Sequence, residues 1–203
     1  LATILERGAQ VQASPLYPVI LGLVLIGCFT KSAQFPFHFW LPHAMAAPTP
    51  VSAYLHSATM VKAGVFLLAR LWPVLAGTEA YTVIVTSVGL VTMVFAAVVA
   101  LFRHDLKSIL AYSTISQLGM LVMLLGFSLE AAALAAVLHI LNHAAFKAAL
   151  FMAAGIVDHE TGTRDIRRLG GLAKVMPVTA LVATLAAASM AGLPPLGGFI
   201  SKE

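Results

Sequence analysis

Long apolar runs alternate with short polar links along the whole of the 203-residue chain. A helix that spans a bilayer needs about 20 mostly apolar residues. Six segments fit this description, at residues 16–30, 51–72, 82–102, 106–126, 129–157 and from about residue 176 onward. The pattern therefore predicts an all-α polytopic membrane protein, a helix bundle of about six transmembrane segments.

Two of the apolar segments are expected to contain broken helices. Proline lacks the backbone N–H and its ring clashes with the preceding turn, so a helix is interrupted where prolines gather. The prolines concerned are Pro36, Pro42, Pro48 and Pro50 in the first break, and Pro194 and Pro195 in the second. Lys31 lies beside the first break and Lys202 beside the second. Broken helices in corresponding positions of two halves are typical of a transport path built from repeats. No letter-by-letter repeat is visible, so this internal symmetry stays a hypothesis.

The composition agrees with a membrane protein and excludes several other classes. Hydrophobic residues make up 60% of the chain and charged residues 10%, whereas a soluble domain carries about 25% charged residues. The net charge of +4 does not indicate a nucleic-acid partner, because no basic stripe with interleaved aromatic residues exists. The single cysteine, Cys28, provides neither a disulfide framework nor a metal cluster. No Walker loop, dinucleotide fingerprint or nucleophile elbow is present, so no cofactor is expected.

Basic residues gather in the links on one side of the predicted membrane. That side holds Arg103, Lys107, Arg164, Arg167, Arg168 and Lys174, and the other holds Arg7 and Arg70 with Glu6, Glu79 and Glu130. Lysine and arginine are enriched in cytoplasmic loops. We therefore expect a multi-pass protein of the cell membrane, with cytoplasmic loops at 103–107 and 158–175 and the N-terminal end outside. Because the chain begins without Met and ends within a motif, we also expect an internal fragment of a longer membrane protein.

His139, His143 and Lys147 are the most informative ionisable residues within the apolar segments. Their spacing of four places them on one slightly spiralling stripe of a helix, about 12 Å long. A lysine at the bilayer centre costs at least ~2.5–3.5 kcal/mol, and histidine changes its charge near neutral pH, so the stripe predicts stepwise proton transfer. Isolated polar residues in a helix interface are the plainer alternative, although three aligned groups would each need separate compensation. A zinc site is disfavoured, because no Glu or third His has the needed spacing and Lys147 would repel a cation.

Three further lysines allow two interpretations each. Lys31 ends the first apolar run, and it either extends toward the interface or acts in transport. Lys62 follows His56 by six residues, which places the two on different helix faces, and it either extends to the interface or pairs with an acid. Lys107 follows Asp105, a candidate N-cap, and is either a cytoplasmic anchor or part of a proton entrance. The embedded stretches contain no Asp or Glu, so any acidic partners are expected elsewhere.

Four blocks of sequence resemble a known family. They are the run from Lys31 to Gly64, which contains the stretch FPFHFWLP, and the blocks at 105–119, 139–147 and 193–203. Together they are similar to the antiporter-like membrane subunits shared by respiratory complex I and the multisubunit Na+/H+ antiporters. The first block most resembles the A-type subunits of the Mrp antiporters. The blocks cover almost the whole chain.

The resemblance implies a bundle with two inverted five-helix repeats, each containing a broken helix. Residues 1–203 would cover the second half of the first repeat and most of the second. The resemblance also implies roles: Lys31 pairs with a glutamate on a preceding helix, His56 links two half-channels, and Lys202 ends the second broken helix. His139, His143 and Lys147 would form the central relay between them.

The function implied by the resemblance is that of a membrane subunit in a multisubunit cation/proton antiporter. Such a protein moves protons through the buried Lys/His relay in exchange for Na+ or another monovalent cation, and works within a bilayer beside other membrane subunits. It would be a secondary transporter and not an enzyme. Two alternatives stay open. One is a proton-pumping subunit of complex I, as part of an NADH:quinone oxidoreductase, or of a membrane-bound hydrogenase, and the other is a structural scaffold with incidental charges.

Overall fold

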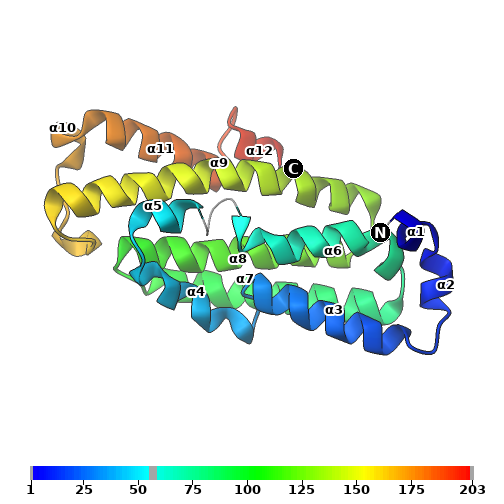
Figure 1. Cartoon of the computed structure of the whole chain (residues 1–203). Coiled ribbons are helices and arrows are strands. Elements are labelled where there is room, and N and C mark those ends of the chain that lie inside the picture. Colours follow the sequence, from blue (N-terminus) through cyan, green and yellow to red (C-terminus); the bar gives the residue numbers. More distant parts are fainter. Residues whose placement is uncertain (1, 55–58, 202–203) are drawn as a thin grey trace.

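The computed structural model of the chain describes residues 2–54 and 59–201 as a bundle of helices that run along one long axis (Figure 1). The regular elements of the described part are helices, which confirms the predicted all-α class, and the single β-bridge joins Asp105 to Asp165. Three helices are long and apolar enough to cross a membrane. These are α7 (Glu79–Leu101), α8 (Leu106–Gly126) and α9 (Glu130–Thr161).

The other predicted segments contain shorter helices, because breaks end them early. Apolar helices α3 (Tyr17–Lys31) and α11 (Pro177–Ala191) correspond to the first and last segments. In the second segment, the described residues include α5 (Thr49–Ser52), α6 (Lys62–Leu75) and π-helical residues at 53–54 and 59. Two short helices, α1 (Ala2–Glu6) and α2 (Gly8–Gln12), precede α3 at the end of the bundle where the chain begins.

The chain leaves the regular helix at both proline-rich stretches. After Lys31 it forms short helical pieces before α5, and after Ala191 it turns at Gly192, whose φ of 87° suits a glycine that ends a helix. The pieces are η1 (Phe37–Phe39), α4 (Trp40–His43), η2 (Ala44–Ala46) and, after the second break, α12 (Gly197–Ile200). Pro50 lies in the first turn of α5, where its missing N–H removes no helical hydrogen bond.

Helices α7 and α8 approach each other closely at glycines. A Cβ atom built on Gly89 would lie 2.4 Å from the backbone nitrogen of Met123, and one built on Gly119 would lie 2.6 Å from that of Met93. Glycines let the backbones of membrane helices come together, since lipid supplies no hydrophobic drive for their association. This pairing fixes α8 on one side, while α9 packs on another.

Helix α9 is longer than the sequence pattern predicts, and the loop expected from residue 158 begins later. The helix continues to Thr161 and ends at Gly162, which has a left-handed φ of 66°. No glycine or proline interrupts residues 156–161, so nothing stops the helix at Val157. Asp158 therefore lies on the last turn of α9 and not in a loop.

The connection between α7 and α8 pairs with the connection that follows α9. Leu106 N donates to Arg164 O at 3.0 Å, and Ile166 N donates to His104 O at 2.9 Å. The Asp105 side chain accepts from Ser108 N at 2.8 Å, which confirms the predicted N-cap. These connections and the short helices η4 (Ile166–Arg168) and α10 (Leu172–Val175) lie at the end of the bundle opposite α1 and α2 (Figure 1). The basic loops thus share one end, and the side of the membrane on which that end lies stays a prediction.

Candidate functional site

The predicted stripe on α9 is buried against α8. His139, His143 and Lys147 have no exposed surface. Helices α8 and α9 are antiparallel neighbours. Residue numbers therefore increase along α9 as they decrease along the facing side of α8. Gln117 contacts His139, and Ser113 contacts Lys147.

Lys147 binds only uncharged oxygen atoms in the part of the chain that the structure describes. Its Nζ donates to the carbonyl oxygen of Leu110 at 3.4 Å and, in a short contact, to the Ser113 hydroxyl. Salt bridges of the described residues do not include Lys147. A buried ammonium without a carboxylate partner is costly to maintain. Such a group is more readily explained by a functional requirement than by stability.

His139 is held through both ring nitrogens. Its Nε2 lies 2.9 Å from Gln117 Oε1, and its Nδ1 lies 2.9 Å from Ser201 Oγ. Because an amide oxygen only accepts hydrogen bonds, Nε2 is the protonated nitrogen of the neutral ring. The Ser201 hydroxyl can then donate to Nδ1, or it can accept from a protonated Nδ1 and donate to Gly198 O at 3.4 Å. The same contacts therefore suit both charge states of the imidazole.

His143 lies between these two residues and has a different environment. Neither of its ring nitrogens has a hydrogen-bond partner among the described residues, although the side chain is fully buried. Its ring packs edge-on against Phe146 at 5.3 Å and lies 6.2 Å from the ring of His139. A buried polar group without a partner costs about 1–3 kcal/mol. An ionisable ring retained at that cost marks a position that warrants a functional explanation.

Lys62 joins the same cluster from α6. Its side chain is buried, and its Nζ donates to the carbonyl oxygen of Ile140, between His139 and His143 in sequence, at 3.1 Å. The contact joins α6 to α9 across 78 residues of sequence. The sequence left two interpretations of Lys62, an extension to the membrane interface or a pairing with an acid. The contact seen here is instead with a backbone carbonyl oxygen inside the bundle.

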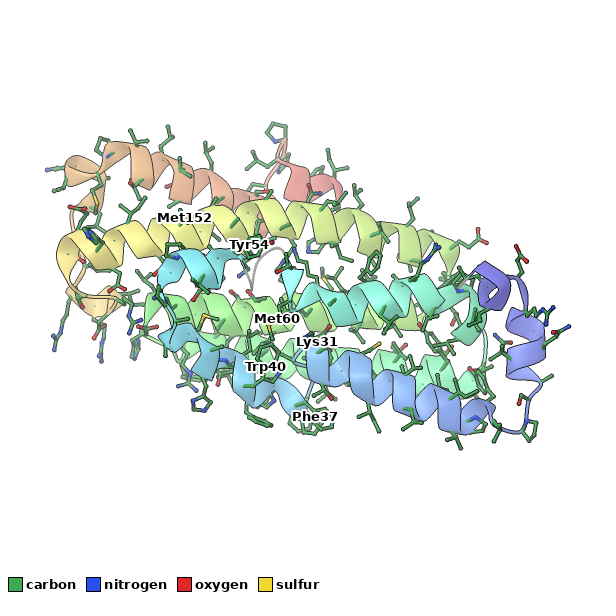
Figure 2. The ribbon with its side chains drawn as sticks, in the orientation of Figure 1. Lys31, Phe37, Trp40, Tyr54, Met60 and Met152 are labelled. Carbon is green, nitrogen blue, oxygen red and sulfur yellow. The ribbon has the colours of Figure 1, made fainter. Side chains whose placement is uncertain are left out.

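The remaining predicted residues lie apart from the stripe or outside the described part. Lys31 ends α3 and is exposed on this chain, on the α3 and α4 side of the bundle, whereas α9 runs along the opposite side (Figure 2). His56 and Lys202 lie outside the described residues. Lys107 is buried near the start of α8, with Nζ 3.3 Å from Ala47 O and 3.9 Å from Asp158 Oδ2.

Sequence reasoning missed the polar partners on α8 and after α12. Ser113 and Gln117 are four residues apart on a helix expected to be apolar. Ser201 directly precedes Lys202, the residue for which the sequence predicted a role. Their spacing was a usable signal, because positions four apart share a helix face. Only the antiparallel register with α9 shows which residues of the stripe they meet.

The arrangement combines three ionisable groups with neutral hydrogen-bond partners in one buried line. Lysine and histidine side chains can gain and lose protons, the contacts of His139 suit either charge state, and in neutral His143 one ring nitrogen carries a proton while the other can accept one. The described residues contain no group of three or more His, Cys, Asp or Glu side chains placed to hold a metal ion. Stepwise proton transfer along this line stays a prediction.

Comparisons with known proteins find named antiporter subunits among the relatives of this chain. The chain is 65% identical over its whole length to a Rhizobium meliloti protein described as a probable K(+)/H(+) antiporter subunit of type A/B, and covers 20% of that protein. It is 58% identical over 192 residues, 89% of the chain, to the Na(+)/H(+) antiporter subunit designated A in Bacillus subtilis, and covers 24% of it. The chain thus spans only about a fifth to a quarter of the length of these two relatives.

Two solved structures share the fold. The Mrp complex from Dietzia sp. DQ12-45-1b matches with a TM-score of 0.90 and 53% identity over 95% of this chain and 21% of that one. The membrane-bound sulfane sulfur reductase, an archaeal respiratory membrane complex, matches with a TM-score of 0.85 and 31% identity over 96% and 42%. The family model described as NADH:quinone oxidoreductase/Mrp antiporter, TM, matches residues 1–203. With a buried line of ionisable groups in a membrane-type helix bundle and a match along its full length, this chain belongs to the NADH:quinone oxidoreductase/Mrp antiporter transmembrane family.

Proposed function

We propose that this chain is part of a membrane subunit of a multisubunit cation/proton antiporter. Protons move through the buried Lys/His line in exchange for Na+ or another monovalent cation. The observation that carries the proposal is the fully buried stripe of His139, His143 and Lys147 on α9, in which His139 contacts Gln117 and Ser201, and Lys147 contacts Leu110 O and Ser113. The relatives named as antiporter subunits support the exchange reaction. In this proposal the protein is a secondary transporter and not an enzyme.

The proton path is electrostatic in mechanism. A neutral His143 between Lys147 and His139 accepts a proton from one side and releases it to the other, and Ser201 adjusts its hydroxyl to the charge on His139. In this proposal Lys31, His56 and Lys202 also carry protons, with Lys31 on the α3 side of the bundle and apart from the stripe (Figure 2), while Lys62 contributes charge beside the stripe. Lys31 would pair with an acid on a helix that precedes this chain, since it is exposed here.

The remaining parts of the proposal concern placement. Residues 1–203 form the second half of one inverted repeat and most of the next, and they lie in the cell membrane as a multi-pass segment. The basic end, which contains residues 103–107 and 158–175, faces the cytoplasm, and the N-terminal end lies outside. Other membrane subunits and lipid cover the exposed apolar faces, for example at Leu134 and Val178.

A redox-driven proton pump is the second candidate. It is favoured by the likeness to an archaeal respiratory membrane complex at 31% identity. The antiporter relatives are far more similar, at 58% and 65% identity, and we therefore favour exchange. A structural scaffold is the weakest candidate, because it leaves the unpartnered His143 and the buried Lys147 without a role.

The proposed exchange can be tested with the full-length complex in everted membrane vesicles. After respiration has acidified the vesicles, addition of Na+ or K+ should dissipate the pH gradient, because entering cations drive protons out. Vesicles without the complex are the control, and fluorescence of a pH-sensitive dye is the measurement. Two results together would favour the pump instead. The pH gradient would be unchanged by Na+ or K+, and a pH gradient would form when the purified complex oxidises a redox substrate.

Removal of the Ser201 hydroxyl should slow exchange roughly fivefold to tenfold, the equivalent of one ordinary hydrogen bond of about 1–1.4 kcal/mol. Ser201→Ala removes the partner of His139 Nδ1, whereas Ser201→Thr keeps a hydroxyl at the same place. Rates of cation-driven proton movement in vesicles give the result. Ser87→Ala, on α7 and away from the stripe, is the matched control. Equal rates for Ser201→Ala and Ser87→Ala would exclude a role for Ser201 in this step.

A further inference from the structure

A large cavity opens at the basic end of the bundle, and we call it the vestibule. Its volume is about 1170 Å³. Its walls come from residues 46–50 between η2 and α5, from residues 104–107 at the start of α8, and from residues 152–167 at the end of α9 and beyond. Figure 1 shows these segments together at the end opposite α1 and α2. The vestibule brings solvent to the buried ends of α8 and α9.

Four charged side chains form a network across the vestibule wall. Asp158 Oδ2 lies 3.9 Å from Lys107 Nζ, and Asp158 Oδ1 lies 3.9 Å from Arg164 Nε. Arg164 Nε also lies 3.1 Å from Asp105 Oδ2. The network joins α8, α9 and the following loop, so it depends on the fold and not on sequence neighbours. Asp158 is the acid that lies between two cations.

The other charged groups of the vestibule are engaged locally. Arg167 pairs with Asp165 two residues away at 2.7 Å, and the guanidinium holds the pKa of the Asp165 carboxyl far below its usual range. Asp165 therefore remains ionised at neutral pH and accepts no proton there. Glu160 pairs with the adjacent His159 at 3.1 Å, and both side chains are largely exposed. His104 also lines the vestibule.

Exposure distinguishes the two members of the Lys107–Asp158 pair. The Asp158 side chain is 32% exposed, whereas that of Lys107 is 5% exposed. Asp158 therefore meets water in the vestibule, and Lys107 lies on the protein side of it. Beyond Lys107, the next turn of α8 carries Leu110, whose carbonyl oxygen accepts from Lys147. The pair stands between the solvent and the buried stripe.

We propose that Asp158 is the proton-loading group of this subunit, which takes protons from the vestibule and passes them to Lys107. The proposal rests on the proposed exchange function and adds a site residue on the basic side. Arg164 is a positioning residue, which together with Lys107 holds the Asp158 carboxylate in place. When Lys107 has released its proton toward Lys147, protonated Asp158 returns one to the Lys107 amine. The Asp158 carboxylate is then reprotonated by water in the vestibule, so the proton count balances in each step.

The test uses the full-length complex in everted vesicles. Asp158→Asn keeps the size and polarity of the side chain but cannot carry a proton, and we expect exchange to fall at least tenfold with the complex assembled. Asp158→Glu should keep most of the rate. Glu160→Gln is the matched control, since it neutralises a neighbouring vestibule acid, and it should exchange at the wild-type rate. Wild-type exchange by Asp158→Asn, or equal losses in Asp158→Asn and Glu160→Gln, would overturn the proposal.

A second measurement separates proton loading from a structural role and applies even if Asp158→Asn does not assemble. A carboxylate that loses a cationic neighbour binds its proton at higher pH. Arg164→Gln removes such a neighbour, so the pH at half-maximal exchange should lie higher in this variant than in the wild type. The charged groups that face Asp158 are Lys107 from α8 and Arg164 from the loop. An unmoved pH profile would contradict proton loading, whereas a wild-type complex without any exchange would instead refute the proposed function.

Discussion

Replacing Lys147 by methionine should abolish cation-driven proton movement while the complex still assembles. The ammonium is fully buried and binds only Leu110 O and the Ser113 hydroxyl among the described residues. Exchange of a buried charge for an apolar side chain of similar volume is often neutral or stabilising for the fold. The proton carrier is lost, and positioned proton transfer contributes typically 10²–10⁴-fold to a rate. We expect at least a loss of about a hundredfold in the vesicle assay.

Lys147→Arg makes this prediction sharper. Arginine keeps the positive charge and can still donate to both oxygens, but it does not release its proton in proteins. If Lys147 serves as a carrier, Lys147→Arg should assemble and fail to exchange, as Lys147→Met does. Lys174→Met, at an exposed position of α10, controls for the loss of one lysine. Exchange by Lys147→Arg at the wild-type rate would show that only the charge is needed.

Gly89→Val should prevent stable assembly, although Gly89 lies outside the proposed path. A Cβ at this position would lie 2.4 Å from Met123 N and 2.7 Å from Gly119 O. Both are backbone atoms, which cannot relieve the clash by a side-chain rotation. Helices α7 and α8 must then separate, at a cost of about 3 kcal/mol, the upper end of the usual range for overpacking. Loss of α7 contact would also displace α8, which carries Ser113 and Gln117. The thermal midpoint of the complex in detergent and the amount recovered give the measurement.

A matched variant distinguishes this packing effect from a general intolerance of larger residues. Gly27 lies on α3, and a Cβ there meets no atom of this chain within 4 Å. Gly27→Ala should therefore leave both the thermal midpoint and the yield unchanged. Equal losses for Gly89→Val and Gly27→Ala would contradict the assignment of the effect to the α7–α8 contact.

Much of the fold is predictable from the sequence, because each membrane helix is encoded locally by a long apolar run. The predicted bounds of α8 agree with the structure, and the predicted start of α9 lies within one residue of the observed one. The predicted end of α9 lies four residues too early, since polar Asp158 and His159 suggest a loop while the helix continues to Thr161. In the segment predicted at residues 51–72, the α-helix α6 begins only at Lys62, which the apolar pattern does not indicate because no proline lies within these residues.

The candidate site is only half predictable. The spacing of His139, His143 and Lys147 gives the stripe without any tertiary information. Their partners depend on the register between α8 and α9 and on the return of the chain at Ser201, which no local pattern encodes. Likewise Lys62 meets α9 only through tertiary packing. The roles of Lys31, His56 and Lys202 stay predictions.

The backbone pairing between the two basic connections limits how the vestibule can change shape. Two main-chain hydrogen bonds tie Leu106 to Arg164 and Ile166 to His104, so these segments move as a single rigid unit. The opposite wall, residues 46–50, is tied to that unit by one hydrogen bond among the described residues, from Lys107 to Ala47. Any widening of this mouth is therefore easiest on the side of residues 46–50, and it would break the Lys107 contact first. In the proposed path, the lysine that would receive the proton is therefore also the side chain that joins the two walls of this mouth.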